Sequence, residues 1–390
     1  MKHKTKTGLD LLLTSAKPDL KNKPIGLVCH PASINGGVKP ITDVLQNLSI
    51  VKLFGPEHGI WGNAQDMVGV ETTRDPHTQL PIVSLYGNTF ESLKPKHEDL
   101  ADIDLLIIDL QDIGTRYYTF IYTMAFCLEV CAKQKKKVIV LDRPNPINGL
   151  TLEGPLLQKG FESFVGVYPI PIRHGMTIGE LALYFNEEFS LGCDLKIIPM
   201  QGWQRKMYFE DTGLPWVYPS PNMPTIDTAL VYPGQCLIEA TELSEGRGTT
   251  KPFELTGAPY INPWDLAEKL NALKLPGIIF RPTFFTPTFH KWAGLDCGGV
   301  FLHVTNRALF KPVLTTIQLI KTIHDLYPHD FKWREKPYEF VSDIPAIDLL
   351  WGGPQLREMI AGKLSLKKVC TSNETGWVKF LKKREKYLLY

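Results

Sequence analysis

Short apolar runs alternate with helix-like segments through the first half of this chain, and this alternation constrains the fold more than any other feature. The runs read as buried strands at 24–30, 50–54, 105–110, 137–142 and 195–200, and the helix-like segments lie at 42–47, 119–135 and 178–188. Strands covered on both faces of a parallel sheet read as near-continuous apolar runs separated by helices. The pattern predicts an α/β domain with a doubly wound, Rossmann-like, mostly parallel sheet.

The second half of the chain breaks this pattern. The proline-rich segment at 218–224 cannot continue a regular element. Strand-like runs follow at 230–232, 278–284 and 299–304, and a helix-like segment lies at 313–326. We therefore expect a smaller α+β domain here, which divides the chain into domains at 1–222 and 223–390.

Composition and spacing argue against several classes of protein. The 43 Lys and Arg against 41 Asp and Glu leave a formal charge of +2, too balanced for a nucleic-acid-binding protein. No run approaches the about 20 apolar residues that span a bilayer. The seven cysteines include no Cys-x-x-Cys pair, so we expect neither a metal site nor a disulfide framework. The turn after the first strand lacks Gly-x-Gly-x-x-Gly, and we expect no cofactor.

The basic start of the chain resembles an export signal only superficially. Its apolar run at 11–13 is shorter than the about 7–15 residues of a signal's apolar region. We read this segment as an opening amphipathic helix. The chain as given is expected to be cytoplasmic, or periplasmic or secreted if an export signal has been removed. The pattern predicts no particular oligomeric state.

Charged and amide side chains follow three successive predicted strands. They are Glu57 and His58 after the second strand, Asp109, Asp112, Arg116 and Tyr117 after the third, and Asp142, Arg143 and Asn145 after the fourth. Because ligands of open parallel sheets bind beyond the carboxyl ends of the strands, these residues predict a site. Solvated loops also carry charges, so each residue has a structural alternative.

Glu57 is the sharpest candidate, because glycines on both sides of Pro56-Glu57-His58 permit a backbone path close to a ligand. A partly buried carboxyl at this position suits a general acid. His58 either orients Glu57, serves as a second acid or base, or is a structural histidine. Asp109 and Asp112 can hold a sugar hydroxyl, a helix N-terminus or a metal, and helix capping is the alternative for Asp112.

A polar stretch at 239–254 contributes Glu245 and Arg247, the latter between two glycines. The guanidinium fork matches a carboxylate, so Arg247 is expected to meet an anion. Trp203, Trp216, Tyr218 and Phe253 are expected mostly in the core, with one available as a platform for a sugar ring. An acidic pair, an arginine and aromatic side chains suit an anionic sugar.

Long motifs carry a resemblance that covers nearly the whole chain. They include LFGPEHGIWG, DLQDIGTRYYTF, VLDRPNPING, EGPLL, SFVGVYPIPIRHGMTIGELA, DTGLPWVYPSPNMPT and LSEGRGTTKPFE. The sequence resembles the NamZ family of exo-β-N-acetylmuramidases. The resemblance implies a glycoside hydrolase of cell wall turnover, with a second domain that closes the active-site cleft. It also implies release of terminal N-acetylmuramic acid from the non-reducing end of peptidoglycan fragments.

The resemblance also implies roles for particular residues. Glu57 becomes the principal catalytic residue, and Glu153 of the Glu-Gly-Pro motif a candidate second carboxyl. The lactyl carboxylate of the sugar calls for a cation, for which we nominate Arg247, with Arg116 and Arg173 behind it. The candidate substrate-binding residues are Arg116, Tyr117, Asp142, Arg143, Asn145, Arg173, His174, Glu245 and Arg247.

Several alternatives stay open at this point. A retaining, an inverting and a substrate-assisted mechanism are all compatible with the sequence. A noncatalytic protein that binds peptidoglycan fragments would use the same residues. A metal-assisted hydrolase or deacetylase would use Asp109, Asp112, His58 and His174, although no tight ligand spacing supports it.

Overall fold

The computed structural model describes residues 5–15, 20–65, 68–69 and 73–390, and the chain forms two compact units. Unit 1 contains Met1–Thr151, Gly175–Pro224 and Leu381–Tyr390, and unit 2 contains Leu152–His174 and Thr225–Phe380. The chain passes from unit 1 to unit 2 after Pro224, close to the boundary predicted at 222. The chain also crosses between the units after Thr151, His174 and Phe380, so a single boundary does not describe the division.

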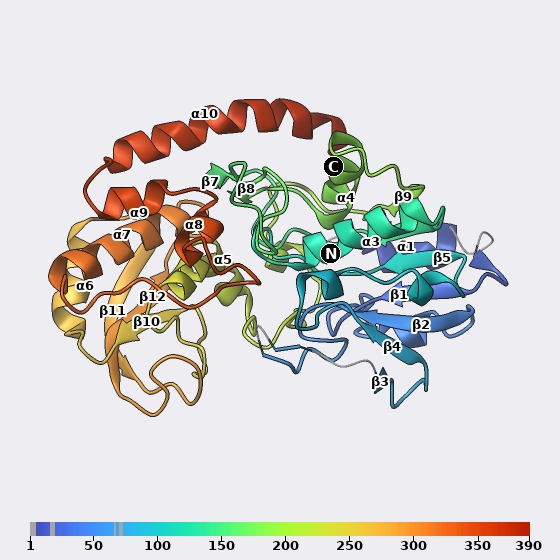
Figure 1. Cartoon of the computed structure of the whole chain (residues 1–390), viewed down its shortest axis with the longest axis horizontal. Helices are drawn as coiled ribbons and strands as arrows, with labels where there is room; N and C mark the ends of the chain where they lie inside the picture. The colour runs from blue at the N-terminus through green and yellow to red at the C-terminus, as the bar shows by residue number, and fades with distance from the viewer. Residues whose placement is uncertain (1–4, 16–19, 66–67, 70–72) are drawn as a thin grey trace. The chain divides into compact units, whose positions relative to one another are not determined.

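A seven-stranded sheet forms the centre of unit 1, which confirms the predicted fold class. Its order is β3-β4-β2-β1-β5-β6-β9, and every neighbouring pair is parallel except β3 with β4. Figure 1 shows its elements: α1 (Gly8–Ser15), β1 (Ile25–Val28), α2 (Ile41–Val44), β2 (Ile50–Gly55), β3 (Thr73–Arg74), β4 (Pro81–Ser84), β5 (Leu105–Ile108), α3 (Phe120–Lys133), β6 (Lys137–Leu141), α4 (Ile178–Glu188) and β9 (Leu195–Ile198). The strand order reverses between β1 and β5, and doubly wound sheets bind ligands at such a switch point.

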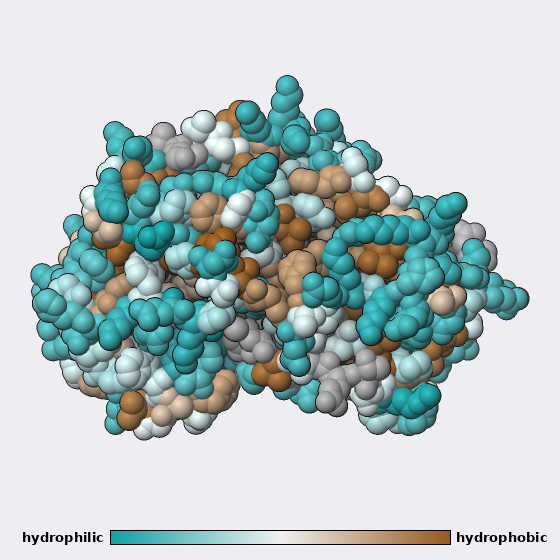
Figure 2. Space-filling model, in the orientation of Figure 1, coloured by the Kyte–Doolittle hydropathy of each residue, from teal (hydrophilic) through white to brown (hydrophobic). Residues whose placement is uncertain are grey.

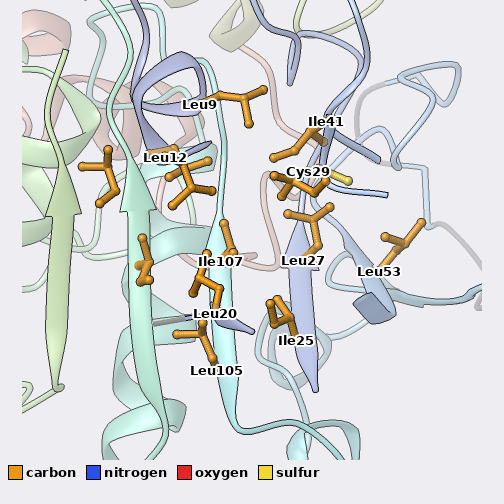
Figure 3. Packing of buried hydrophobic residues seen from close by; sticks show 14 of the residues in the cluster. Leu9, Leu12, Leu20, Ile25, Leu27, Cys29, Ile41, Leu53, Leu105 and Ile107 are labelled. Carbon is orange, nitrogen blue, oxygen red and sulfur yellow. The ribbon is translucent and has the colours of Figure 1, made fainter. Parts of the chain in front are cut away.

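Apolar side chains from α1 and α2 pack against one face of this sheet. Leu9 and Leu12 of α1 and Ile41 of α2 share one cluster with alternate residues of the central strands, as Figure 3 shows. Alternate residues of a strand point to the same face. Strands β1 and β5 are buried along their whole length, as expected of strands covered on both faces. This burial fixes the strand ends from which the candidate residues project.

Unit 2 is a smaller α+β unit, as predicted. Its three-stranded antiparallel sheet has the order β10-β12-β11, and β7 pairs with β8. The elements are β7 (Glu153–Leu156), β8 (Pro171–Arg173), α5 (Ile226–Gln235), β10 (Leu255–Ala258), α6 (Pro263–Ala272), β11 (Ile278–Phe285), β12 (Cys297–Val304), α7 (Pro312–Leu326), α8 (Ala346–Trp351), α9 (Gln355–Ile360) and α10 (Leu366–Arg384), whose end lies in unit 1.

The strand expected at 230–232 is wrong, because these residues lie inside helix α5. Thr225 caps this helix by accepting a hydrogen bond from the Thr228 amide at 3.2 Å. The helix is buried from Thr228 to Gln235, so its apolar run shows no polar face. Periodicity alone does not separate such a buried helix from a buried strand. Strand β10, which the sequence analysis did not predict, has a short LTGA sequence with little strand character.

Among the described residues, no helix is both long and apolar enough to cross a membrane. On the face drawn in Figure 2, hydrophobic side chains are scattered among hydrophilic ones.

The last residues of the chain are built into unit 1. Tyr390 donates its hydroxyl proton to Asp142 Oδ2 at 2.6 Å and accepts a hydrogen bond from the Met200 amide at 2.7 Å. The amide of Leu389 donates to Glu180 Oε1 at 2.9 Å. Asp142 and Met200 follow β6 and β9, so Tyr390 joins the ends of two neighbouring strands.

The contact with Tyr390 predicts a pH-dependent stability. Burial raises the pKa of Asp142 to about 7, although hydrogen bonds from Tyr390, Gly179 and Thr177 oppose the rise. The ordinary carboxyl value is 3.8, so the folded chain binds one more proton than the unfolded chain between these values. The free energy of unfolding should therefore fall as the pH rises from about 4 to about 7. Asp142→Asn should remove this part of the fall.

The measurement is urea unfolding of the wild type and of Asp142→Asn at a series of pH values. Tyr390→Phe serves as a second variant: it removes a donor that lowers the pKa of Asp142, so the fall should extend above pH 7. Parallel curves for the wild type and Asp142→Asn between pH 4 and 7 would contradict the prediction.

Candidate active site

A buried histidine closes the switch point of the sheet. His30 follows β1, and the backbone amide of Gln111, beyond β5, donates to its Nε2 at 2.8 Å. An amide can only donate, so Nε2 is unprotonated and Nδ1 carries the proton, facing the carbonyl of Pro219 at 3.3 Å. Burial lowers the pKa of His30 to about 3, and Arg143 and His58 add to this effect. His30 is therefore a neutral, fixed hydrogen-bonding group.

The sequence analysis did not select His30 as a candidate. A signal was nevertheless available, because His30 occupies the same position after β1 that Glu57 occupies after β2, two residues beyond the last residue of the strand. The turn after β1 lacks a phosphate-binding glycine pattern, yet it places a histidine at the edge of the sheet where ligands bind.

Glu57 lies in the turn that follows β2, on the strand next to β1. It is 5% exposed, and its Oε2 accepts a hydrogen bond from Thr119 Oγ1 at 2.5 Å. Thr119 immediately precedes α3, so the start of that helix fixes the carboxyl group. Among the described residues, no group donates a hydrogen bond to Oε1 of Glu57. One oxygen is thus held by the fold and the other is available to a ligand.

His58 shapes the turn that carries Glu57. Its backbone has a left-handed φ of 70°, a conformation uncommon for a residue with a side chain. Its Nδ1 lies 2.9 Å from the carbonyl oxygen of Ala64. The amide of Gly59 donates to the Pro56 carbonyl at 2.9 Å. His58 is therefore engaged with the backbone of its own loop.

Asp109 and Arg143 form a buried ion pair across the ends of β5 and β6. Nε and Nη2 of Arg143 contact the two carboxylate oxygens of Asp109 at 2.5 and 2.7 Å, and Nη2 also donates to the carbonyl of Ile34 at 2.9 Å. Burial raises the pKa of Asp109, and the adjacent guanidinium opposes the rise. The pair joins the loops after β1, β5 and β6.

A narrow pocket opens beside Arg143. The space that a water molecule can occupy in it is only about 10 Å³, and its walls include Ile34, Gln111, Phe209 and Trp216. Within the described chain, Nη1 of Arg143 has no hydrogen-bond acceptor. Arg143 can therefore offer a donor to an acidic group while it remains paired with Asp109.

The remaining candidates of unit 1 are buried in the loops around these groups. Asp112 Oδ2 accepts from the Gly114 amide at 2.7 Å, which caps a turn. In the side chain of Asn145, Nδ2 donates to the Met176 carbonyl and Oδ1 accepts from the backbone amide of Ile147. Arg116 and Tyr117 are buried, and burial lowers the pKa of Arg116 to about 10. Asp142 faces the C-terminal residues, as described above.

Glu153, Arg173 and His174 belong to unit 2. Glu153 Oε1 accepts from Nη1 of Arg173 at 3.0 Å, and its Oε2 accepts from the Val313 amide at 3.2 Å. Val313 is in the first turn of α7, where a negative charge complements the helix dipole. Glu153 therefore holds the start of a helix, while His174 is fully buried.

Arg247 lies in a network of charges that balance one another in unit 2. Its Nη2 donates to Glu239 Oε1 at 2.8 Å, and its Nε lies 3.3 Å from Glu245 Oε1. Lys291 donates to Glu245 Oε2 at 2.8 Å. Although burial alone would raise it, the pKa of Glu245 is held below its usual range by Lys291, His290 and Arg247. The positive charge of Arg247 is thus matched within the protein.

The structure gathers part of the predicted set at one edge of the unit 1 sheet. This part comprises Glu57, His58, Asp109, Asp112 and Arg143, with His30 added. Glu153, Arg173, His174, Glu245 and Arg247 belong to unit 2. Within the described ranges, no group of three or more His, Cys, Asp or Glu side chains is placed to hold a metal ion.

Comparison with known proteins identifies the family. The family model described as exo-beta-N-acetylmuramidase NamZ, N-terminal, matches residues 25–227, and its C-terminal counterpart matches residues 230–390. The chain is 49% identical to the peptidoglycan beta-N-acetylmuramidase NamZ of Bacillus subtilis (strain 168), over 100% of this chain and 92% of that protein.

Two solved structures of DUF1343 family proteins from Bacteroides fragilis NCTC 9343 are also similar. One has 34% identity and a TM-score of 0.90 with 100% of both chains covered, and the other has 31% identity and a TM-score of 0.77 with 99% of both chains covered. Both family models and a full-length relative at 49% identity show that this chain belongs to the NamZ family of exo-β-N-acetylmuramidases.

Proposed function

We propose that Glu57 is the general acid with which this exo-β-N-acetylmuramidase releases terminal N-acetylmuramic acid from the non-reducing end of peptidoglycan fragments. The observation that carries the proposal is the asymmetry of its carboxyl group. Thr119 fixes Oε2 at 2.5 Å, and Oε1 has no donor among the described residues. A general acid must be held in place and still reach the oxygen that it protonates.

Glycoside hydrolysis also needs a group that attacks the sugar carbon or activates water. Asp109 and Glu153 are each engaged with an arginine, and Asp142 receives hydrogen bonds from Tyr390 and Thr177. These engagements disfavour the three carboxylates as nucleophiles. They support a route in which the acetamido oxygen of the substrate attacks, because that route needs no carboxylate nucleophile from the protein.

The lactyl carboxylate of N-acetylmuramic acid needs a cationic partner. Arg247 and Arg173 are paired with glutamates, and Arg116 is buried in the core of unit 1. Arg143 is paired with Asp109 as well, but its Nη1 has no acceptor among the described residues. We therefore nominate Arg143, through Nη1, as the arginine that binds the acidic group.

The test is incubation with an N-acetylmuramic acid–N-acetylglucosamine disaccharide, followed by mass analysis of the released sugars. Release of N-acetylmuramic acid is the expected result. Binding of the disaccharide without release would instead support a noncatalytic protein that binds wall fragments. With longer peptidoglycan fragments, exo action predicts that only the terminal N-acetylmuramic acid is released and that the internal ones stay intact.

A further inference from the structure

Trp61 is exposed on the same turn that carries Glu57. Its side chain is 54% exposed, while Trp203 and Trp351 are buried. Over the described part of the chain, Trp61 makes no hydrogen bond or ring contact. Tryptophan buries more apolar area than almost any other side chain, so an exposed one contributes little to folding. Trp264 of α6 is similarly exposed at 62%, but it packs edge-on against Phe284 with ring centroids 5.7 Å apart.

The backbone around Trp61 is held firmly. The amide of Gly62 donates to the Gly59 carbonyl at 3.2 Å. A Cβ atom on Gly62 would lie 2.7 Å from Cγ of Pro31, and the φ of Gly62 is positive at 61°. The turn is therefore packed closely on the loop that follows β1. A binding group on such a rigid frame loses little entropy when it meets a ligand.

Chain geometry keeps Trp61 close to Glu57. Trp61 is the fourth residue after Glu57, so their Cα atoms are at most about 14 Å apart even in a fully extended chain. The turn at 57–62 brings them closer than this limit. A general acid protonates the oxygen that joins the reacting sugar to the leaving sugar. A side chain on the turn of that acid is therefore within reach of the sugars that flank this bond.

We propose that the indole ring of Trp61 stacks on the leaving N-acetylglucosamine residue and so helps to select the substrate. This assignment rests on the proposed role of Glu57. The flat apolar face of an indole matches the C–H face of a pyranose ring, and ligand sites combine such apolar surfaces with a few polar groups. Trp61 supplies the apolar surface, and Glu57 supplies the proton.

Product inhibition tests the proposal because the two products occupy different subsites. Trp61→Ala should weaken inhibition by N-acetylglucosamine about fivefold, since aromatic stacking contributes roughly 1 kcal/mol and tenfold corresponds to 1.4 kcal/mol. Inhibition by N-acetylmuramic acid should stay unchanged. The KM for the disaccharide should rise by a similar factor, and Trp61→Phe should recover part of the loss. Trp264→Ala is the matched control for loss of an exposed tryptophan, and it should leave all values unchanged.

Failure of this proposal is distinguishable from failure of the proposed function. A wild-type chain that releases no N-acetylmuramic acid contradicts the proposed function itself. An active wild type whose Trp61→Ala variant keeps its N-acetylglucosamine inhibition overturns the role of Trp61. Equal weakening of inhibition by both sugars also overturns it, because that result means a general disturbance of the turn. Trp61→Phe provides the same readouts should the alanine variant fold poorly.

Discussion

Glu57→Gln should lower the rate of N-acetylmuramic acid release by at least about 100-fold, the usual effect of losing a general acid. Glutamine has the same shape as the acid, and its amide oxygen can still accept the hydrogen bond from Thr119 Oγ1. The variant should therefore fold as the wild type does and bind the disaccharide. Its amide cannot protonate the leaving oxygen, so the loss should fall on kcat. Initial rates with the disaccharide, together with a thermal unfolding curve, measure both effects.

Glu98→Gln is the matched control for this substitution, because it makes the same change in unit 1 at a side chain that is 77% exposed. We expect it to retain wild-type kcat. Thr119→Val keeps the acid but removes the donor that fixes Oε2, so its loss of kcat should be smaller than that of Glu57→Gln. Near-normal turnover by Glu57→Gln would remove Glu57 from the mechanism.

Arg143→Ala should lower the free energy of unfolding by about 3–5 kcal/mol, because it leaves the buried carboxylate of Asp109 without its partner. The wild-type pair has two contacts, at 2.5 and 2.7 Å, and Arg143 also holds the Ile34 carbonyl. The variant therefore loses contacts between three loops as well as an ion pair. Urea unfolding at pH 7 measures the change, with the circular dichroism of the native state as a check on folding.

A double variant separates two contributions to the loss of stability: the unpaired buried carboxylate of Asp109 and the lost packing of the Arg143 side chain. Asp109→Asn with Arg143→Met removes both charges, so it should be less destabilised than Arg143→Ala alone. The exposed pair of Lys96 and Glu98, at 3.7 Å, provides a control, since such pairs contribute about 0–1 kcal/mol. If Arg143→Ala and Lys96→Ala lowered the free energy of unfolding equally, the buried Asp109–Arg143 pair would contribute no more to stability than the exposed pair does.

The sheet of unit 1 could be predicted because each of its central strands is a local feature. Strands such as β1 and β5 are buried along their whole length, so each one appears in the sequence as a run of consecutive apolar residues. Helix α5 could not be distinguished from a strand, because it is buried on all sides from Thr228 onward and Pro233 interrupts its pattern. Length and apolar content alone do not decide such cases.

The position of the site at the strand ends was predictable in the same way, but the role of each charge was not. Asp109 and Glu57 both follow a strand, yet only Asp109 has an arginine partner, which lies 34 residues further along the chain. Arg247 stands between two glycines as an apparent anion receptor, and Glu239 and Glu245 match its charge. Long-range pairing of this kind leaves no trace in a local motif.

The place of Tyr390 has a consequence for how this chain is made on the ribosome. Residues 381–390 belong to unit 1 but are synthesised after all of unit 2. Domains usually fold in the order in which they emerge during translation. Here the nascent parallel sheet lacks the residue that joins the ends of β6 and β9 until residue 390 has been synthesised. The first unit to begin folding is therefore completed only after unit 2 has been synthesised.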